Sequence, residues 1–245
     1  LWKKQKGYLD WILRKTIVLS KKALKDVVFS PNSKYVVASS SDGKIGFYNM
    51  ATLTKEWEIL ADETGINSID FSPNSQQIVV GTAAGSIFLY DTTGKEIANF
   101  VGHNAAINAV TFSPDGKQII SASDDKTAML WDLNGAVLNI FVGHLKTVNA
   151  AIFSPNNAYV VTASQDGGLF LWTKEGVLLH QIPSINNQAL KSIYFSADSQ
   201  YLMSVSANNN NVILWVVSQN TLIERANNLN LPALSEQTKK AYGLK

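Results

Sequence analysis

The residue types that could do chemistry gather around one stretch, "SASDDKTAMLWD", which runs from Ser121 to Asp132. His103 lies eighteen residues before Ser121, and Asp125 lies four residues after it. A serine, a histidine and an aspartate in one neighbourhood are the components of a nucleophilic hydrolase, in which the histidine activates the serine hydroxyl. The alternative is that the same side chains form the internal bracing of a fold. The organisation of the whole chain decides between these two interpretations.

An internal repeat runs through most of the chain. Its markers are a Phe-Ser-Pro tripeptide, or Phe-Ser-Ala in the last copy, and an aromatic residue that ends each unit. The tripeptides begin at Phe29, Phe71, Phe112, Phe153 and Phe195, spaced by 42, 41, 41 and 42 residues. The terminal aromatics are Tyr48, Tyr90, Trp131, Trp172 and Trp215. A period near 41 predicts one supersecondary unit per repeat.

Each unit is predicted to contain four short strands. In the third unit these are "AINAVTFS", "QIISAS", "TAMLWD" and "AVLNIFV", separated by the turns "PDGK", "DDK" and "LNG". We expect Asn134 and Gly135 to supply positive φ angles in the last turn. Nearly continuous apolar runs such as "QQIVV" and "YVVTAS" indicate strands buried on both faces. Small four-stranded sheets buried on both faces favour a radial stack, which is a β-propeller.

The sequence resembles the WD-repeat family. "GHNAAINAVTFSPDGKQIISASDDKTAMLWD", Gly102 to Asp132, follows that family's pattern, and Gly143 to Thr173 follows it nearly as well. The resemblance extends over roughly Thr16 to Val216. It implies an all-β fold, a β-propeller of four-stranded antiparallel blades. We expect five complete repeats here as part of a seven-bladed ring, and the alternative is a closed ring of fewer blades.

The resemblance also implies a structural network in each well-formed repeat, in which imidazole, hydroxyl, carboxylate and indole are hydrogen-bonded. Carried over by position, the two sets are His103, Ser121, Asp125 and Trp131, and then His144, Thr162, Asp166 and Trp172. A hydrolase needs one such set rather than two at the blade period, and Ser121 lacks a Gly-x-Ser-x-Gly elbow. We therefore expect a brace and no catalytic residues. Three units depart from the pattern and should be less rigid or braced by other contacts; their substituted positions are Ser20 and Ala38, Asp62 and Ala84, and Asn186 and Asn209.

By the same resemblance, partners bind over the rim where the Asp turns meet the Gly-His loops. The partner-binding candidates are Lys25, Ser41, Asn67, Asn108, Asp124, Asn149, Gln165, Lys191 and Asn208. The three asparagines at one register position could also reflect a recent duplication. The rim carries no Trp, Tyr or Arg, which counts against a tight aromatic-anchored peptide site.

The amino-acid composition disfavours several classes of partner and site. The net charge is +2, and nineteen of the 21 basic residues are lysine, whereas arginine is the usual reader of phosphate and guanine. Nucleic acid is therefore an unfavoured partner. The chain has no cysteine, its three histidines are spread out, and no apolar run approaches 20 residues. We expect no cofactor, no metal site, no membrane span and a cytoplasmic, intracellular location.

The domain prediction is a propeller over residues 1–230, with units ending near 48, 90, 131, 172 and 215, and a tail over 231–245. Ser235 and Gly243 suit the two caps of a short C-terminal helix in that tail. Similar tails close many bacterial multidomain WD-repeat proteins, and the chain begins with Leu1-Trp2 rather than Met, so we expect covalently linked upstream domains. The predicted function is a non-catalytic protein-interaction scaffold or sensor domain of a larger signalling or regulatory protein. The alternatives are a propeller-type hydrolase or lyase and a nucleic-acid-binding platform.

Overall fold

The computed structural model describes residues 16, 18–182, 188–208 and 211–217, and every regular element in these residues is a β-strand. The strands form five consecutive antiparallel sheets, the blades. Blade 1 comprises β1 (Leu24–Phe29), β2 (Tyr35–Ser40), β3 (Lys44–Asn49) and β4 (Thr54–Leu60). Blade 2 comprises β5 (Ile66–Phe71), β6 (Gln77–Thr82), β7 (Ile87–Asp91) and β8 (Glu96–Phe100). Blade 3 comprises β9 (Ile107–Phe112), β10 (Gln118–Ser123), β11 (Ala128–Asp132) and β12 (Val137–Phe141). Blade 4 comprises β13 (Val148–Phe153), β14 (Tyr159–Ser164), β15 (Leu169–Thr173) and β16 (Leu178–Ile182). Blade 5 comprises β17 (Leu190–Phe195), β18 (Tyr201–Ser206) and β19 (Val212–Val216).

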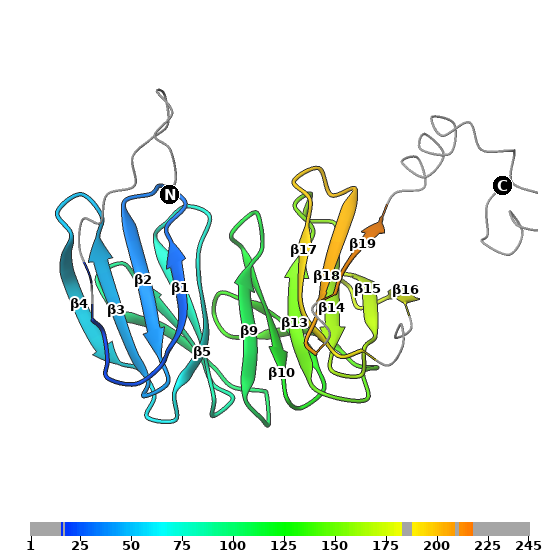
Figure 1. The fold of residues 1–245 in the computed structure, drawn as a ribbon, viewed down its shortest axis with the longest axis horizontal. Helices are drawn as coiled ribbons and strands as arrows, with labels where there is room; N and C mark the ends of the chain where they lie inside the picture. Colours follow the sequence, from blue (N-terminus) through cyan, green and yellow to red (C-terminus); the bar gives the residue numbers. More distant parts are fainter. Residues whose placement is uncertain (1–15, 17, 183–187, 209–210, 218–245) are drawn as a thin grey trace, which may run out of the picture.

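The blades stand next to one another through their first strands. β1 packs against β5, β5 against β9, β9 against β13, and β13 against β17. Figure 1 shows these inner strands side by side, with β4 and β16 at the two outer edges of the view. The predicted all-β architecture of antiparallel blades is confirmed in this part of the chain; blades 1 to 4 have four strands, and blade 5 has three strands among the described residues.

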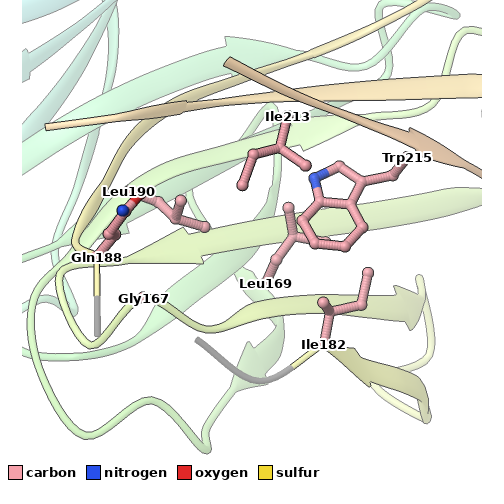
Figure 2. Close-up of a pocket in the computed structure, with 7 residues that line it drawn as sticks. All are labelled: Gly167, Leu169, Ile182, Gln188, Leu190, Ile213 and Trp215. Atoms are coloured by element: carbon pink, nitrogen blue, oxygen red, sulfur yellow. The ribbon is translucent and has the colours of Figure 1, made fainter. Parts of the chain in front are cut away.

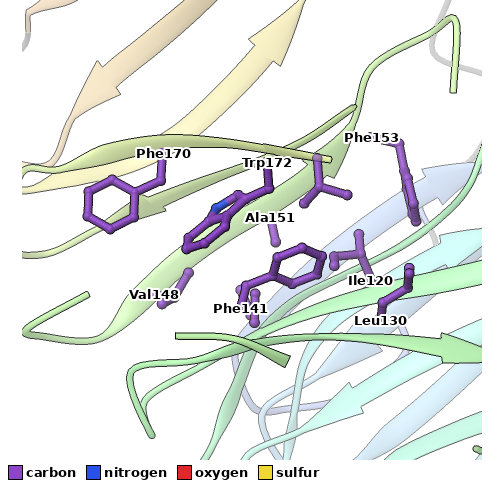
Figure 3. Close-up of a cluster of buried hydrophobic side chains, with 11 residues drawn as sticks. Ile120, Leu130, Phe141, Val148, Ala151, Phe153, Phe170 and Trp172 are labelled. Carbon is purple, nitrogen blue, oxygen red and sulfur yellow. The ribbon is translucent and has the colours of Figure 1, made fainter. Parts of the chain in front are cut away.

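The second strand of each blade explains why the repeat needs its neighbours. In β2, β6, β10 and β14 every residue after the first is buried, so these strands are covered on both faces. Between blades 3 and 4, for example, Ile120 and Leu130 of one blade pack with Val148 and Phe153 of the next in one apolar cluster (Figure 3). A single blade could not bury these faces, because each apolar layer is built from two blades.

The first blade has an uncovered apolar face. Leu24, Val27 and Phe29 of β1 are 50%, 52% and 61% exposed. The residues at the same positions of β5, which are Ile66, Ile69 and Phe71, are at most 4% exposed because blade 1 packs against them. Within the described residues no blade lies against the outer face of blade 1, so the five blades form an arc that is open at this side.

The hairpin after β11 differs in one detail from expectation. Gly135 has a φ of 92°, but Asn134 does not have a positive φ. The loop has three residues between paired ends, and the ladder between β11 and β12 shifts register after Leu130. A three-residue hairpin ends in a single left-handed residue next to a bulge, so only the glycine position needs the positive φ.

Between blades 4 and 5 lies a small cavity, lined by Leu169, Leu190, Ile213 and Trp215 among others (Figure 2). Its volume of about 10 Å³ offers room for about one water molecule, so it is a packing gap rather than a ligand site. The predicted tail over 231–245, its helix, and the positions Leu1, Trp2, Asn186 and Asn209 lie outside the described residues.

Candidate functional site

The serine, histidine and aspartate of blade 3 lie in direct contact. His103 Nε2 lies 2.7 Å from Ser121 Oγ, and His103 Nδ1 lies 2.7 Å from Asp125 Oδ2. The indole Nε1 of Trp131 donates to Ser121 Oγ at 2.8 Å. Because Asp125 accepts a hydrogen bond, the proton of a neutral His103 belongs on Nδ1, and Nε2 then accepts the hydroxyl proton of Ser121. The chain of donors therefore runs from Trp131 through Ser121 and His103 to Asp125.

The ends of this network are anchored on backbone and turn. Asp125 Oδ2 accepts the backbone N–H of Asn104, and Oδ1 accepts the hydroxyl and the backbone N–H of Thr127. Ser121 and Trp131 have no exposed surface, and His103 is also buried. One oxygen of the carboxylate thus bonds to the loop before β9 and the other bonds within the turn between β10 and β11, which ties the loop to the turn.

The electrostatics of the network favour a neutral imidazole beside an ionised carboxylate. Burial lowers the pKa of His103 below its usual value, and the hydrogen bond to Asp125 only partly opposes this shift. Burial would raise the pKa of Asp125, but the hydrogen bonds from Thr127 and His103 outweigh it, so that pKa is lowered. The serine hydroxyl is enclosed between the imidazole and the indole and has no exposed surface, so no substrate carbonyl could reach it.

Blade 4 repeats the arrangement with a threonine. His144 Nε2 lies 2.8 Å from Thr162 Oγ1, and Trp172 Nε1 donates to the same hydroxyl at 3.0 Å. Asp166 Oδ2 lies 3.2 Å from His144 Nδ1 and accepts the backbone N–H of Leu145. The imidazole of His144 also stacks on Phe170, with ring centroids 4.1 Å apart. Two copies with the same bonding pattern support a structural role for both sets.

The degenerate blades use other contacts. In blade 1 the hydroxyl of Ser20 stands in for the imidazole and donates to Asp42 at 2.8 Å. Ala38 supplies no hydroxyl, and the buried Tyr48 hydroxyl has no hydrogen-bond partner within the described part of the chain. In blade 2, Asp62 bonds within its own loop, to Thr64.

Blade 5 keeps one bond that the sequence interpretation missed. Trp215 Nε1 donates to Ser204 Oγ at 2.9 Å. The signal was present, because Ser204 lies at the position of Ser121 and Thr162 in the repeat.

The rim is built by one backbone hydrogen bond that recurs in all five blades. In each blade, a residue just before the turn between the second and third strands donates its N–H to a carbonyl in the loop before the inner strand; in blades 1 to 4 this donor directly precedes the Asp position. The donors are Ser41, Ala83, Asp124, Gln165 and Ala207, with distances of 2.8–2.9 Å. In blade 5 the donor is one residue before the predicted position, Asn208. These bonds place the two loops of each blade side by side, which is where the sequence predicted the partner-binding rim.

The other predicted rim residues occupy β-bulges. In each blade the pairing between the first and second strands skips one residue of the inner strand. The skipped residues are Lys25, Asn67, Asn108, Asn149 and Lys191. A bulge leaves a residue unpaired and redirects its side chain, and bulges are common beside functional sites. The spacing of apolar residues in the sequence does not predict these bulges.

The three asparagines at the bulges connect neighbouring blades. The Nδ2 atoms of Asn67, Asn108 and Asn149 donate to the carbonyls of Ile107, Val148 and Leu190 at 3.0, 3.1 and 2.6 Å. Each accepting carbonyl belongs to the residue just before the bulge of the next blade. These asparagines are partly buried, whereas Lys25, Asp124, Gln165, Lys191 and Asn208 are exposed. The asparagine register thus has a structural explanation besides duplication.

Two further classes of site can be addressed in the described residues. No group of three or more His, Asp or Glu side chains there is arranged to hold a metal ion. No helix in this part of the chain has the length and apolarity to cross a membrane.

Comparison with known proteins identifies the repeat. The family model "WD domain, G-beta repeat" matches four stretches, residues 13–49, 55–91, 94–132 and 135–173, which together make up more than half of the chain. No curated protein matches the sequence. Repeats of this family generally mediate protein–protein interaction or scaffolding, and they are generally non-catalytic. With its phased repeats, its four-stranded blades and this match, the chain belongs to the WD40-repeat family.

Proposed function

We propose that this chain is a non-catalytic scaffold that binds a protein partner over the rim where the loops before the inner strands meet the turns between the second and third strands. The observation that carries the proposal is the recurrence of the bulge and the loop-joining hydrogen bond in every blade. Together they hold two short loops rigidly at one edge of each blade. Such a rigid, repeated edge lets polar side chains contact a partner with little ordering cost.

The exposed members of the rim are the best candidates for contact. Asp124 and Gln165 lie in the turns of blades 3 and 4, and Lys191 lies on the bulge of blade 5. One carboxylate, one amide and one ammonium group along neighbouring blades suit a polar partner surface of mixed charge. Polar rim contacts of this kind set specificity and association rate more than affinity. The signalling or regulatory role that we propose for the scaffold would be set by which partner binds to this rim.

The experiment is a pull-down from a native lysate with the double variant Asp124→Ala and Gln165→Ala. The matched control is Gln76→Ala with Lys117→Ala, which removes an exposed amide and an exposed charge from the turns at the opposite ends of blades 2 and 3. We expect loss of specific partners for the first pair and none for the second. Asn108 and Asn149 are left unchanged, because their replacement would also loosen the blades. Equal retention of partners by both variants would move the binding surface elsewhere.

A further inference from the structure

A larger concavity lies at the opposite end of the inner strands from the rim. It has a volume of about 640 Å³ and is lined by the last residues of β5, β9, β13 and β17 and by the prolines of the Phe-Ser-Pro turns. This volume lies within the range of small-molecule sites, which are mostly apolar with a few polar groups. The lining follows that pattern, and it includes Asp70, Thr111, Ile152 and Tyr194, which occupy the same position on β5, β9, β13 and β17.

Asp70 is the one charged residue of this lining. Its Oδ1 accepts the backbone N–H of Phe71 at 2.9 Å, and its Oδ2 accepts the backbone N–H of Phe112 at 2.8 Å. An ionised carboxylate offers about four acceptor positions, so these bonds leave about two free. None of the ion pairs among the described residues involves Asp70. Among the described residues, Asp70 is therefore a partly buried carboxylate without a cationic partner.

The fold does not require a carboxylate at this position. The residues in the same place on the other inner strands are Val28, Thr111, Ile152 and Tyr194, and those strands form without it. Burial raises the pKa of Asp70 to about 6, which makes the ionised form costly in the free protein. The two backbone N–H groups hold the carboxylate in place but supply no positive charge to offset its own.

The polarity of the pocket is divided between its two sides. The carboxylate of Asp70 and the hydroxyl of Thr111 come from blades 2 and 3, whereas Ile152 and the 54% exposed Tyr194 come from blades 4 and 5. A ligand that matches this division has a positive charge at one end and an apolar body at the other. We propose that this pocket binds a small amphipathic primary amine, with its ammonium group on Asp70 and its apolar body against Ile152 and Tyr194.

An ammonium group fits this carboxylate better than a guanidinium group. A guanidinium makes two parallel hydrogen bonds and needs both carboxylate oxygens open on one edge. Each oxygen of Asp70 already accepts one backbone N–H, so a compact ammonium that needs one or two acceptors is the better match. Pairing would also remove the cost of leaving this charge alone in the pocket.

The test is calorimetric titration of the folded chain with 2-phenylethylammonium chloride, alongside 2-phenylethanol as an uncharged probe of similar size. We expect the ammonium to bind at least about tenfold more tightly than the alcohol. Asp70→Asn should lower the ammonium affinity by about tenfold or more. The matched control is Asp26→Asn. Asp26 on β1 also accepts its neighbour's backbone N–H and one from the next blade, Ile69, but it does not line the pocket.

The pH dependence gives a second measurement that needs no variant. Asp26 is the other charge that acts on Asp70, and Tyr194 is the other titratable group of the lining. Between pH 5 and pH 7 Asp70 loses its proton while the amine, with a pKa near that of lysine at about 10, stays charged. Binding of the ammonium should therefore strengthen about tenfold over this interval. Equal affinity for alcohol and ammonium, an equal loss in Asp26→Asn, or binding that does not change between pH 5 and pH 7 would each overturn the proposal.

Discussion

Ser121 is the centre of the blade 3 network, and its replacement by alanine tests whether that network is a brace. The hydroxyl accepts from Trp131 Nε1 and donates to His103 Nε2, at 2.8 and 2.7 Å. Ser121→Ala leaves both of these buried groups without a partner. A buried polar group that loses its partner costs about 1–3 kcal/mol, so the free energy of unfolding should fall by about 2–6 kcal/mol.

Two other variants should lower the free energy of unfolding by smaller amounts and allow a comparison with Ser121→Ala. In blade 5 the equivalent Ser204 makes only the bond from Trp215 within the described residues, so Ser204→Ala should cost about 1–3 kcal/mol. In blade 4, Thr162→Ser keeps the hydroxyl that His144 and Trp172 contact and loses only a methyl group, so it should cost about 1 kcal/mol.

The assay is urea unfolding followed by tryptophan fluorescence and by far-UV circular dichroism, with the free energy of unfolding taken from the linear extrapolation. The indole N–H resonance of Trp131 should also shift in Ser121→Ala. If Ser121→Ala lowers the free energy of unfolding by no more than Thr162→Ser, the hydroxyl does not hold the network together and the bracing argument fails.

Two further predictions concern charge and the contacts between blades. The pKa values of His103 and His144 are lowered by burial, so their contribution to stability is present above about pH 6.5 and is lost on acidification, whereas Asp70, with a raised pKa of about 6, contributes stability that grows as the pH falls through 6. Thermal melts from pH 7 to pH 5 should therefore show a steeper loss in Asp70→Asn than in the native chain, by about 1 kcal/mol, and parallel curves would contradict this. Asn149→Ala removes the bond to the Leu190 carbonyl and should lower the free energy of unfolding by about 1 kcal/mol, whereas Lys191→Ala at the next bulge should leave it unchanged within about 0.5 kcal/mol in the same urea experiment.

Local sequence was sufficient to predict the strands, whereas the two complete networks were predicted from the resemblance to the WD-repeat family. The alternation of apolar runs with Pro-Asp-Gly and Asn-Gly turns depends on residues close together in the chain, and β10 begins and ends where "QIISAS" does. His103, Ser121, Asp125 and Trp131 all belong to one repeat, so their fixed spacing brings them together once the strands form. The single left-handed residue of the hairpin after β11 was the detail that the turn rule did not resolve.

Contacts between blades could not be predicted in the same way, because they join residues about 40 positions apart. The asparagine side chains find their acceptors only after neighbouring blades pack. In blade 1, Ser20 stands where blades 3 and 4 have a histidine. Its hydrogen bond to Asp42 could not be predicted either, because it depends on where the fold places Asp42. Neither relation leaves a periodic signal, since each depends on the relative position of two separately folded loops.

The sequence by itself determined the repeat and the blade, because hydrophobic periodicity and turn chemistry act within one repeat. Only the tertiary structure decided which polar residues of the rim remain exposed. Packing of adjacent blades buries the asparagine amides at the bulges and leaves Asp124 and Gln165 exposed. It also makes Asp70 the one charged residue in the lining of the pocket, because that lining is assembled from inner strands that are far apart in the sequence.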